Sequence, residues 1–147
     1  MNTEFTNQTN AFIFPVRVYY EDTDAGGVVY HSQYLNFMER ARTEWLRELG
    51  FEQDNLTQEL GIALVVRHLQ IDYCKPARFN DRLQVQTRLT EMMRSYCIFE
   101  QSVWRQEAGD SLTSLTTATV KIACLSLERL RPVAIPTAIR SKLNRVD

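Results

Sequence analysis

The chain has 147 residues, 44% of them hydrophobic, and a formal net charge of −1 at pH 7. This length suits one domain with a full core and excludes a second domain of ordinary size. The near-neutral charge disfavours a nucleic-acid partner, and the lack of an apolar run near the length of a membrane span, or of a signal peptide, predicts a cytoplasmic protein without a transmembrane segment.

The three cysteines, Cys74, Cys97 and Cys124, lie 23 and 27 residues apart. No pair has the CxxC or Cys/His spacing of a zinc site, and an odd number does not suit a disulfide framework. We therefore expect three buried free thiols, which fits a reducing compartment, and no metal or separate cofactor.

Residues 1–11 are polar and lack hydrophobic periodicity, so we expect a flexible lead-in to a single domain over residues 12–147. Apolar and polar side chains then alternate from residue 16 to residue 21, which is typical of a half-buried strand. The residues that this pattern predicts on the buried face are Val16, Val18 and Tyr20.

An acidic turn follows. Glu21, Asp22 and Asp24 put three carboxylates within four residues, and crowding of this kind makes the least solvated one a candidate acid or base. We expect Glu21 and Asp22 to stay solvated, which leaves Asp24 as the candidate. The next residues, Gly26 and Gly27, permit a close backbone turn, and the missing side chain of Gly27 leaves room for a ligand.

The turn leads into the one long amphipathic helix of the sequence. Apolar residues recur at steps of three and four until Gly50, a residue that often ends helices. The opposite face is charged, as expected for a solvated surface. The apolar stripe consists of Tyr34, Leu35, Phe37, Met38, Ala41, Trp45, Leu46 and Leu49.

The second half of the chain favours strands. A short irregular helix is expected before Gly61, and alternation or β-branched composition then predicts four strands joined mostly by short turns. An edge segment over 131–135 and a last helix begun by Pro136 complete the chain. The four strands are expected within residues 62–74, 83–89, 94–106 and 112–127.

One long helix followed by four or five strands describes an α+β domain in which an antiparallel sheet wraps around the helix. A sheet so curved leaves unpaired edges, and pairing of edges across a two-fold axis is a common solution. We therefore expect a homo-oligomer, either a dimer or a dimer of dimers.

A resemblance becomes visible in the acidic turn and the start of the helix. Arg17-Val18, Thr23-Asp24, Gly27-Val28-Val29-Tyr30-His31 and Tyr34 resemble, in order and spacing, the signature of the 4-hydroxybenzoyl-CoA thioesterase family. The longer run VRVYYEDTDAGGVVYH with ERARTEWLR is similar to its YbgC-type acyl-CoA thioesterase branch, whose bacterial members are encoded beside the Tol-Pal envelope system. The likeness covers most of the chain.

The resemblance implies a hotdog fold, acyl-CoA as the substrate, and a homotetramer as one assembly. It implies that Asp24 is the catalytic carboxylate and that the backbone N–H of His31 points at the thioester carbonyl. Tyr20, Tyr30 and Tyr34, with Gly27, are the expected substrate-binding residues. Acyl-carrier protein is an alternative carrier of the acyl group.

Thioester hydrolysis suits so small a set of residues. It needs a group that attacks or directs water and a donor for the oxyanion that forms. The leaving thiol is acidic, with a pKa of about 8.5 for a model thiol, so a dedicated general acid is less necessary. Asp24 can act either as a general base or as the nucleophile, and the sequence does not choose between them.

Each assignment has a plainer alternative. Without the resemblance, Asp24 is more often a turn or capping residue, the tyrosines are more often core, and the His31 imidazole is a wall of the site or a direct participant. Two other functions stay open: a hotdog hydratase or dehydratase, and a non-catalytic scaffold for acyl-carrier protein or envelope components. The cations that either bind coenzyme A phosphates or are simply solvated are Arg67, Lys75, Arg78 and Arg88.

Overall fold

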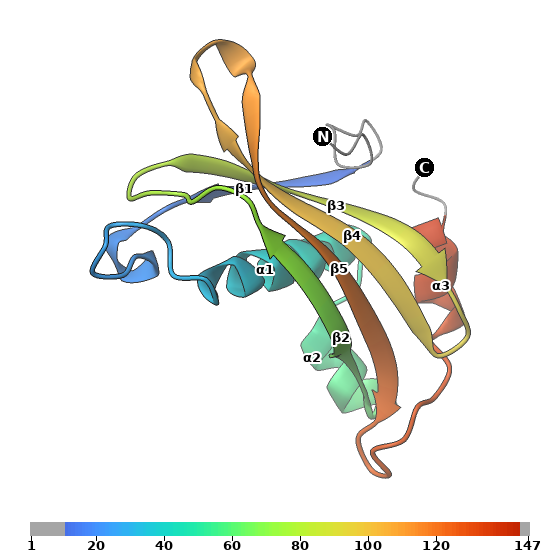
Figure 1. Cartoon of the computed structure of the whole chain (residues 1–147). Helices are drawn as coiled ribbons and strands as arrows, with labels where there is room; N and C mark the ends of the chain where they lie inside the picture. The colour runs from blue at the N-terminus through green and yellow to red at the C-terminus, as the bar shows by residue number, and fades with distance from the viewer. Residues whose placement is uncertain (1–10, 145–147) are drawn as a thin grey trace.

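The computed structural model describes residues 11–144, so the expected lead-in over residues 1–11 lies outside the described residues except for Ala11. Five antiparallel strands form one sheet in the order β1-β3-β4-β5-β2. The sheet curves around helix α1, which lies on its concave side (Figure 1). This confirms the predicted α+β architecture. The strands are β1 (Phe12–Arg17), β2 (Ile62–Tyr73), β3 (Arg82–Met92), β4 (Tyr96–Gln106) and β5 (Leu112–Ser126).

Shorter elements connect the strands. The irregular helix predicted before Gly61 is present as α2 followed by the π-helical turn η3. The segment 131–135 makes only an isolated bridge, between Pro132 and Leu125, rather than a strand. The helical elements are η2 (Tyr20–Asp22), α1 (Gln33–Glu48), α2 (Gln53–Asn55), η3 (Leu56–Leu60), η4 (Ala108–Asp110) and α3 (Thr137–Asn144).

Helix α1 supplies the centre of the core. Its apolar stripe packs against the inner side chains of the sheet, as the three- and four-residue spacing predicts. The predicted stop is confirmed, because Gly50 has a φ of +100° and the N–H of Phe51 donates to the carbonyl of Leu46. Lys142 of α3 also donates to the Leu49 carbonyl (3.1 Å). The buried residues of α1 are Tyr34, Phe37, Met38, Ala41, Trp45 and Leu46.

The first strand lies earlier in the chain than predicted. Strand β1 begins at Phe12 and ends at Arg17, and residues Tyr20–Asp22 form a 3₁₀ turn instead of continuing it. The turn breaks the alternation, so the Tyr20 side chain is 76% exposed rather than buried. The cause is Asp22, whose side chain turns inward and accepts a hydrogen bond from the Tyr19 N–H (2.8 Å).

Strand β2 also departs from simple alternation. Its register with β5 shifts between Val66 and His68, so Arg67 forms a bulge. Strand β3 has a similar shift between Leu89 and Glu91. Bulges increase local bending and twist, which suits a sheet that wraps around a helix.

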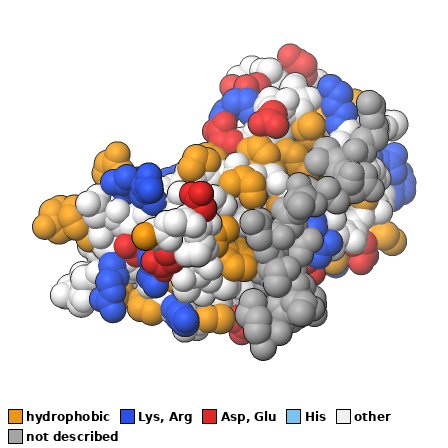
Figure 2. Space-filling view, turned by 90° about the horizontal axis from the view of Figure 1, so that it is seen from above, with side chains coloured by type: hydrophobic (Ala, Val, Ile, Leu, Met, Phe, Trp, Pro, Cys, Tyr) orange, Lys and Arg blue, Asp and Glu red, His pale blue; other side chains and the backbone are white. Residues whose placement is uncertain are grey.

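In the view from above, acidic and basic side chains are interspersed over the visible face (Figure 2).

A buried polar network joins α1 to the sheet. The Gln101 side chain, 1% exposed, donates from Nε2 to the Met38 carbonyl (3.0 Å) and to Thr87 Oγ1 (2.8 Å). Its Oε1 accepts a hydrogen bond from Arg42 Nη1 (2.8 Å). Burial lowers the pKa of Arg42. The Gln101 side chain therefore accepts a hydrogen bond from a half-buried cation, Arg42, which the helical pattern alone would place in solvent.

We expect Gln101→Leu to lower the free energy of unfolding by about 2–3 kcal/mol, because it leaves the Arg42 guanidinium and the Thr87 hydroxyl without their partner. Urea denaturation measures the change. The same substitution at Gln58, an exposed residue of η3, serves as the control and should change stability by less than about 0.5 kcal/mol. Equal effects of the two substitutions would contradict a role for this network.

The cysteines differ from the prediction at one position. Cys97 and Cys124 are buried, but Cys74 is exposed because it follows the end of β2. Burial raises the pKa of the Cys97 thiol to about 12 and also raises the pKa of Cys124. Since the thiolate is the reactive form, the two buried thiols should be inert near neutral pH.

We expect a disulfide reagent at pH 8 to modify one thiol, Cys74, in the folded protein and three after denaturation. At that pH only about one Cys97 side chain in ten thousand is a thiolate, given a pKa of about 12. Cys74→Ser should abolish the fast reaction and leave the two slow ones. Rapid modification of three thiols in the native state would show that the core opens readily.

Candidate active site

The acidic turn folds into a tight hairpin just before α1. The Tyr30 N–H donates to the Asp22 carbonyl, Thr23 bridges to Val29, and the Asp24 N–H donates to the Val28 carbonyl. Gly27 has a φ of +83°, a conformation that side chains disfavour. The sequence therefore uses Gly27 for the turn itself, while no described atom lies within 4 Å of the position its Cβ would occupy.

Asp24 lies near the tip of this hairpin and is exposed. Its Oδ1 accepts a hydrogen bond from the Gly26 N–H (2.8 Å). This is the turn-stabilising role that the sequence predicts as the alternative to catalysis. Within residues 11–144 its Oδ2 has no hydrogen-bond partner. A Cβ added at Gly26 would come within 3.3 Å of Oδ1, so Gly26 keeps space around the carboxylate.

Asp22 is buried, which corrects the expectation that it stays solvated. Its Oδ2 accepts from the Tyr19 N–H and its Oδ1 accepts from Gln33 Nε2, both at 2.8 Å. Gln33 is the first residue of α1. The Asp22 carboxylate therefore ties the base of the hairpin to the start of the helix, which fixes where both lie.

His31 lies between the hairpin and α1. Its side chain is exposed and packs on the Tyr30 ring, with centroids 4.4 Å apart. Among the described residues, its backbone N–H donates to no protein group. The first amides of a helix carry partial positive charge and lack intrahelical partners, so this N–H is suited to bind developing negative charge.

The three predicted tyrosines lie in different surroundings. Tyr20 is exposed and stacks on Phe79, with ring centroids 4.2 Å apart. Tyr30 is 50% exposed. Tyr34 is 3% exposed, and its hydroxyl accepts a hydrogen bond from the Ala77 N–H (2.9 Å). Burial raises the pKa of Tyr34 above its ordinary value, so the hydroxyl stays protonated.

A cavity of about 240 Å³ adjoins His31. It brings His31 and Tyr34 together with residues from the end of β2 and the loop that follows it. Asp24 and Tyr20 do not line it. The lining residues are Val29, His31, Tyr34, Tyr73, Cys74, Lys75 and Pro76.

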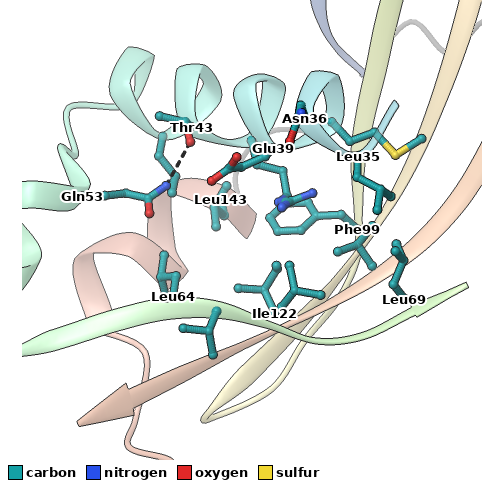
Figure 3. Close-up of a pocket in the computed structure, with 16 residues that line it drawn as sticks. Leu35, Asn36, Glu39, Thr43, Gln53, Leu64, Leu69, Phe99, Ile122 and Leu143 are labelled. Carbon is teal, nitrogen blue, oxygen red and sulfur yellow. Dashed lines mark hydrogen bonds between the residues drawn. The ribbon is translucent and has the colours of Figure 1, made fainter. Parts of the chain in front are cut away.

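Two further cavities lie nearby. One of about 490 Å³ runs between α1 and strands β2 and β5, where Leu35, Asn36 and Glu39 from the helix face Leu64 and Leu69 from β2 (Figure 3). The other, of about 560 Å³, includes Tyr20 and Phe79. Asp24 lines none of these three cavities.

The hairpin register separates the two expected catalytic groups. Asp24 lies opposite Val28, and His31 follows Val28 by three residues. A single chain thus presents Asp24 toward the hairpin tip and the His31 amide at its base, beside the smallest of the three cavities.

The candidate phosphate-binding cations are also placed differently. Arg88 forms an ion pair with Glu100 on the neighbouring strand β4. Lys75 lines the cavity beside His31. Arg67 and Arg78 are exposed, and their side chains have no partner in the described part of the chain. No group of three or more His, Cys, Asp or Glu side chains within residues 11–144 is arranged to hold a metal ion.

Sequence reasoning missed Tyr73, the last residue of β2. Its hydroxyl donates to the carbonyl of His31 (2.8 Å). The only local signal was the position of Tyr73 just before the turn residues Lys75-Pro76, and nothing in that pattern indicates a contact 42 residues away in sequence.

Comparison with known proteins identifies the family of the chain. A model of the thioesterase-like superfamily matches residues 18–143. An acyl-CoA thioesterase YbgC from Haemophilus influenzae is 48% identical over 137 residues, covering 93% of this chain and 97% of that protein. No helix within the described residues is both long and apolar enough to cross a membrane.

Solved structures show the same fold. A 1,4-dihydroxy-2-naphthoyl-CoA thioesterase from Synechocystis superposes with a TM-score of 0.85 at 26% identity, covering 93% of this chain and 98% of that one. A 4-hydroxybenzoyl-CoA thioesterase from Pseudomonas sp. strain CBS-3 superposes with a TM-score of 0.82 at 20% identity, covering 90% and 98%. The chain therefore has the hotdog fold and belongs to the thioesterase-like superfamily, in its YbgC-type branch.

Proposed function

We propose that this enzyme hydrolyses acyl-CoA thioesters to the free acid and coenzyme A, with Asp24 as the catalytic carboxylate and the backbone N–H of His31 as the oxyanion donor. The observation that carries the proposal is the unpartnered His31 amide at the start of α1, beside a cavity of about 240 Å³. Short- or medium-chain acyl groups, including aromatic ones, stay the predicted substrates. Coenzyme A is part of the substrate, so no separate cofactor is required.

The oxyanion donor lowers the barrier because charge develops on the thioester oxygen only as the carbonyl carbon is attacked. A donor that is already fixed in place needs no reorganisation at that moment, and its loss typically raises the barrier by about 2.7–4 kcal/mol. His31 lies between two contacts with Asp22: the Tyr30 N–H donates to the Asp22 carbonyl, and Gln33 Nε2 donates to the Asp22 carboxylate.

Asp24 fits either role of a catalytic carboxylate. Its Oδ1 is held by Gly26, which leaves Oδ2 to take a proton from water or to attack the carbonyl carbon. In the first case, water adds directly and the thiolate leaves. In the second, the thiolate leaves from an acyl-aspartyl anhydride, which water then cleaves to the acid and the free carboxylate.

We propose that a second copy of the chain completes the site, as a dimer or a dimer of dimers. Within one chain Asp24 lies near the hairpin tip and lines none of the three cavities, so the cavity beside His31 lacks the expected carboxylate. Strand β2 ends the sheet and offers a pairing edge. Acyl-carrier protein as an alternative carrier, a cytoplasmic location and an association with the Tol-Pal system stay predictions.

We expect Asp24→Asn to lower kcat for acyl-CoA hydrolysis by at least about a hundredfold, because the amide neither accepts the proton nor attacks. The free energy of unfolding should stay within about 0.5 kcal/mol of the parent, since the carboxylate is exposed. Release of coenzyme A, measured with a thiol reagent and corrected for Cys74, gives the rate. Undiminished hydrolysis would refute the role of Asp24.

Asp22→Asn is the matched comparison, because it makes the same chemical change two residues away. Asp22 is buried and accepts two hydrogen bonds, so this variant should lose about 1–3 kcal/mol of stability. Its folded fraction should hydrolyse acyl-CoA faster than Asp24→Asn does, because it keeps the Asp24 carboxylate, although the Asp22–Gln33 contact is weakened. Neither the parent nor the two variants should consume an enoyl-CoA. Consumption by the parent would indicate hydratase activity.

The backbone and side chain of His31 can be tested separately. His31→Ala keeps the N–H and should retain kcat within about fivefold, whereas His31→Pro removes the N–H and should lower kcat by about 10²–10³. Proline is tolerated around the first turn of a helix, so the fold should survive, as circular dichroism and urea titration will show. A large loss in His31→Ala with an active His31→Pro would assign the chemistry to the imidazole.

A further inference from the structure

The last residue of β2 makes a long-range contact with the start of α1. Tyr73 Oη donates to the His31 carbonyl oxygen at 2.8 Å, across 42 residues of sequence. The Tyr73 ring also packs edge-on against the rings of His31 (6.3 Å between centroids, 89°) and Tyr34 (5.5 Å, 65°). The contact is therefore built from a hydrogen bond and two aromatic packings.

The His31 carbonyl has no other partner among the described residues. At the start of α1, the Gln33 N–H donates to Tyr30 and the Leu35 N–H donates to Ser32, so neither amide uses the carbonyl of His31. Without Tyr73, the orientation of residue His31 would rest only on its neighbours in the chain.

A second tyrosine joins the same two segments. Tyr34, the second residue of α1, accepts a hydrogen bond from the Ala77 N–H in the loop that follows β2 (2.9 Å). The start of α1 and residues 73–77 are thus joined by two hydrogen bonds, both donated from residues 73–77. Because Tyr34 is buried, it gives the Tyr73 ring a fixed surface to pack against.

We propose that Tyr73 is a positioning residue for the oxyanion donor: its hydroxyl holds the His31 backbone so that the His31 N–H stays directed at the thioester carbonyl. The inference rests on the proposed function. The donated hydrogen bond also offsets the partial negative charge of the His31 carbonyl oxygen, which would otherwise repel an oxyanion forming nearby. Burial raises the pKa of Tyr73, so the hydroxyl remains a donor through the neutral range.

Tyr73→Phe tests the hydroxyl alone, because the ring and its packing remain. We expect kcat for acyl-CoA hydrolysis to fall about tenfold, the equivalent of one well-aligned hydrogen bond, with KM within about twofold of the parent. The melting temperature and the urea midpoint should stay close to those of the parent. A role in folding alone would move the stability and leave kcat of the folded enzyme unchanged.

Tyr96→Phe is the control. The Tyr96 hydroxyl also donates to a protein oxygen, Glu91 Oε2 at 3.3 Å, but it lies at the start of β4 in the β3–β4 hairpin. This variant should match the parent in kcat, KM and stability. A tenfold loss in Tyr96→Phe as well would overturn the assignment, since a remote hydroxyl would then have the same effect.

A measurement without substrate separates this inference from the proposed function. In ¹⁵N-labelled protein, Tyr73→Phe should shift the amide resonances of His31 and Ser32 and speed their hydrogen exchange, whereas Tyr96→Phe should not. Unchanged resonances at both positions, or an unchanged kcat in Tyr73→Phe, would refute the positioning role. If the parent hydrolyses no acyl-CoA while these resonances do shift, the proposed function fails and the contact stands.

Discussion

The burial of α1 in the concave face of the sheet is the constraint on which the other features depend. Phe37 and Ala41 are fully buried, and Met38 is nearly so. Each large apolar side chain buried in this way contributes about 1.5–3 kcal/mol, while the net stability of a domain is only about 5–15 kcal/mol. The rotation and depth of α1 are therefore fixed by its core face, and its first turn is placed wherever that face requires.

The elements around the helix start adapt to this position. Asp22, Tyr34 and Tyr73 each make one hydrogen bond that spans from α1 or its preceding residues to another segment. None of them lies at the tip of the hairpin, where Asp24 is exposed. The molecule thus combines a helix start that is held on several sides with a carboxylate on a short turn, an arrangement that suits a fixed donor and an accessible base.

The fold was largely predictable because its signals are local. The spacing of Tyr34, Phe37 and Ala41 defines α1, and Gly50 ends it through its own backbone conformation. Strand β1 was misplaced because the alternation continues formally to Glu21, while the inward turn of Asp22 ends it. That turn depends on Gln33, eleven residues away, so no local pattern contains it.

The candidate site was predictable only where the resemblance reached. Asp24, Gly27 and His31 lie on or beside the hairpin that the motif indicates. The variants at Asp24 and His31 test the roles that the family resemblance implies. Tyr73 and the inward-facing Arg42 depend on contacts between elements 42 and 59 residues apart in sequence. Local periodicity carries no information on what a distant segment offers to these side chains.

The bulge at Arg67 has a consequence for how the free edge of β2 meets other molecules. An uninterrupted edge of twelve residues accepts an added strand in many alignments, and so invites open-ended stacking into aggregates. The bulge divides this edge into two shorter stretches with different pleat phases. A neighbouring strand can match both only in an alignment that accommodates the extra residue, which disfavours open-ended stacking.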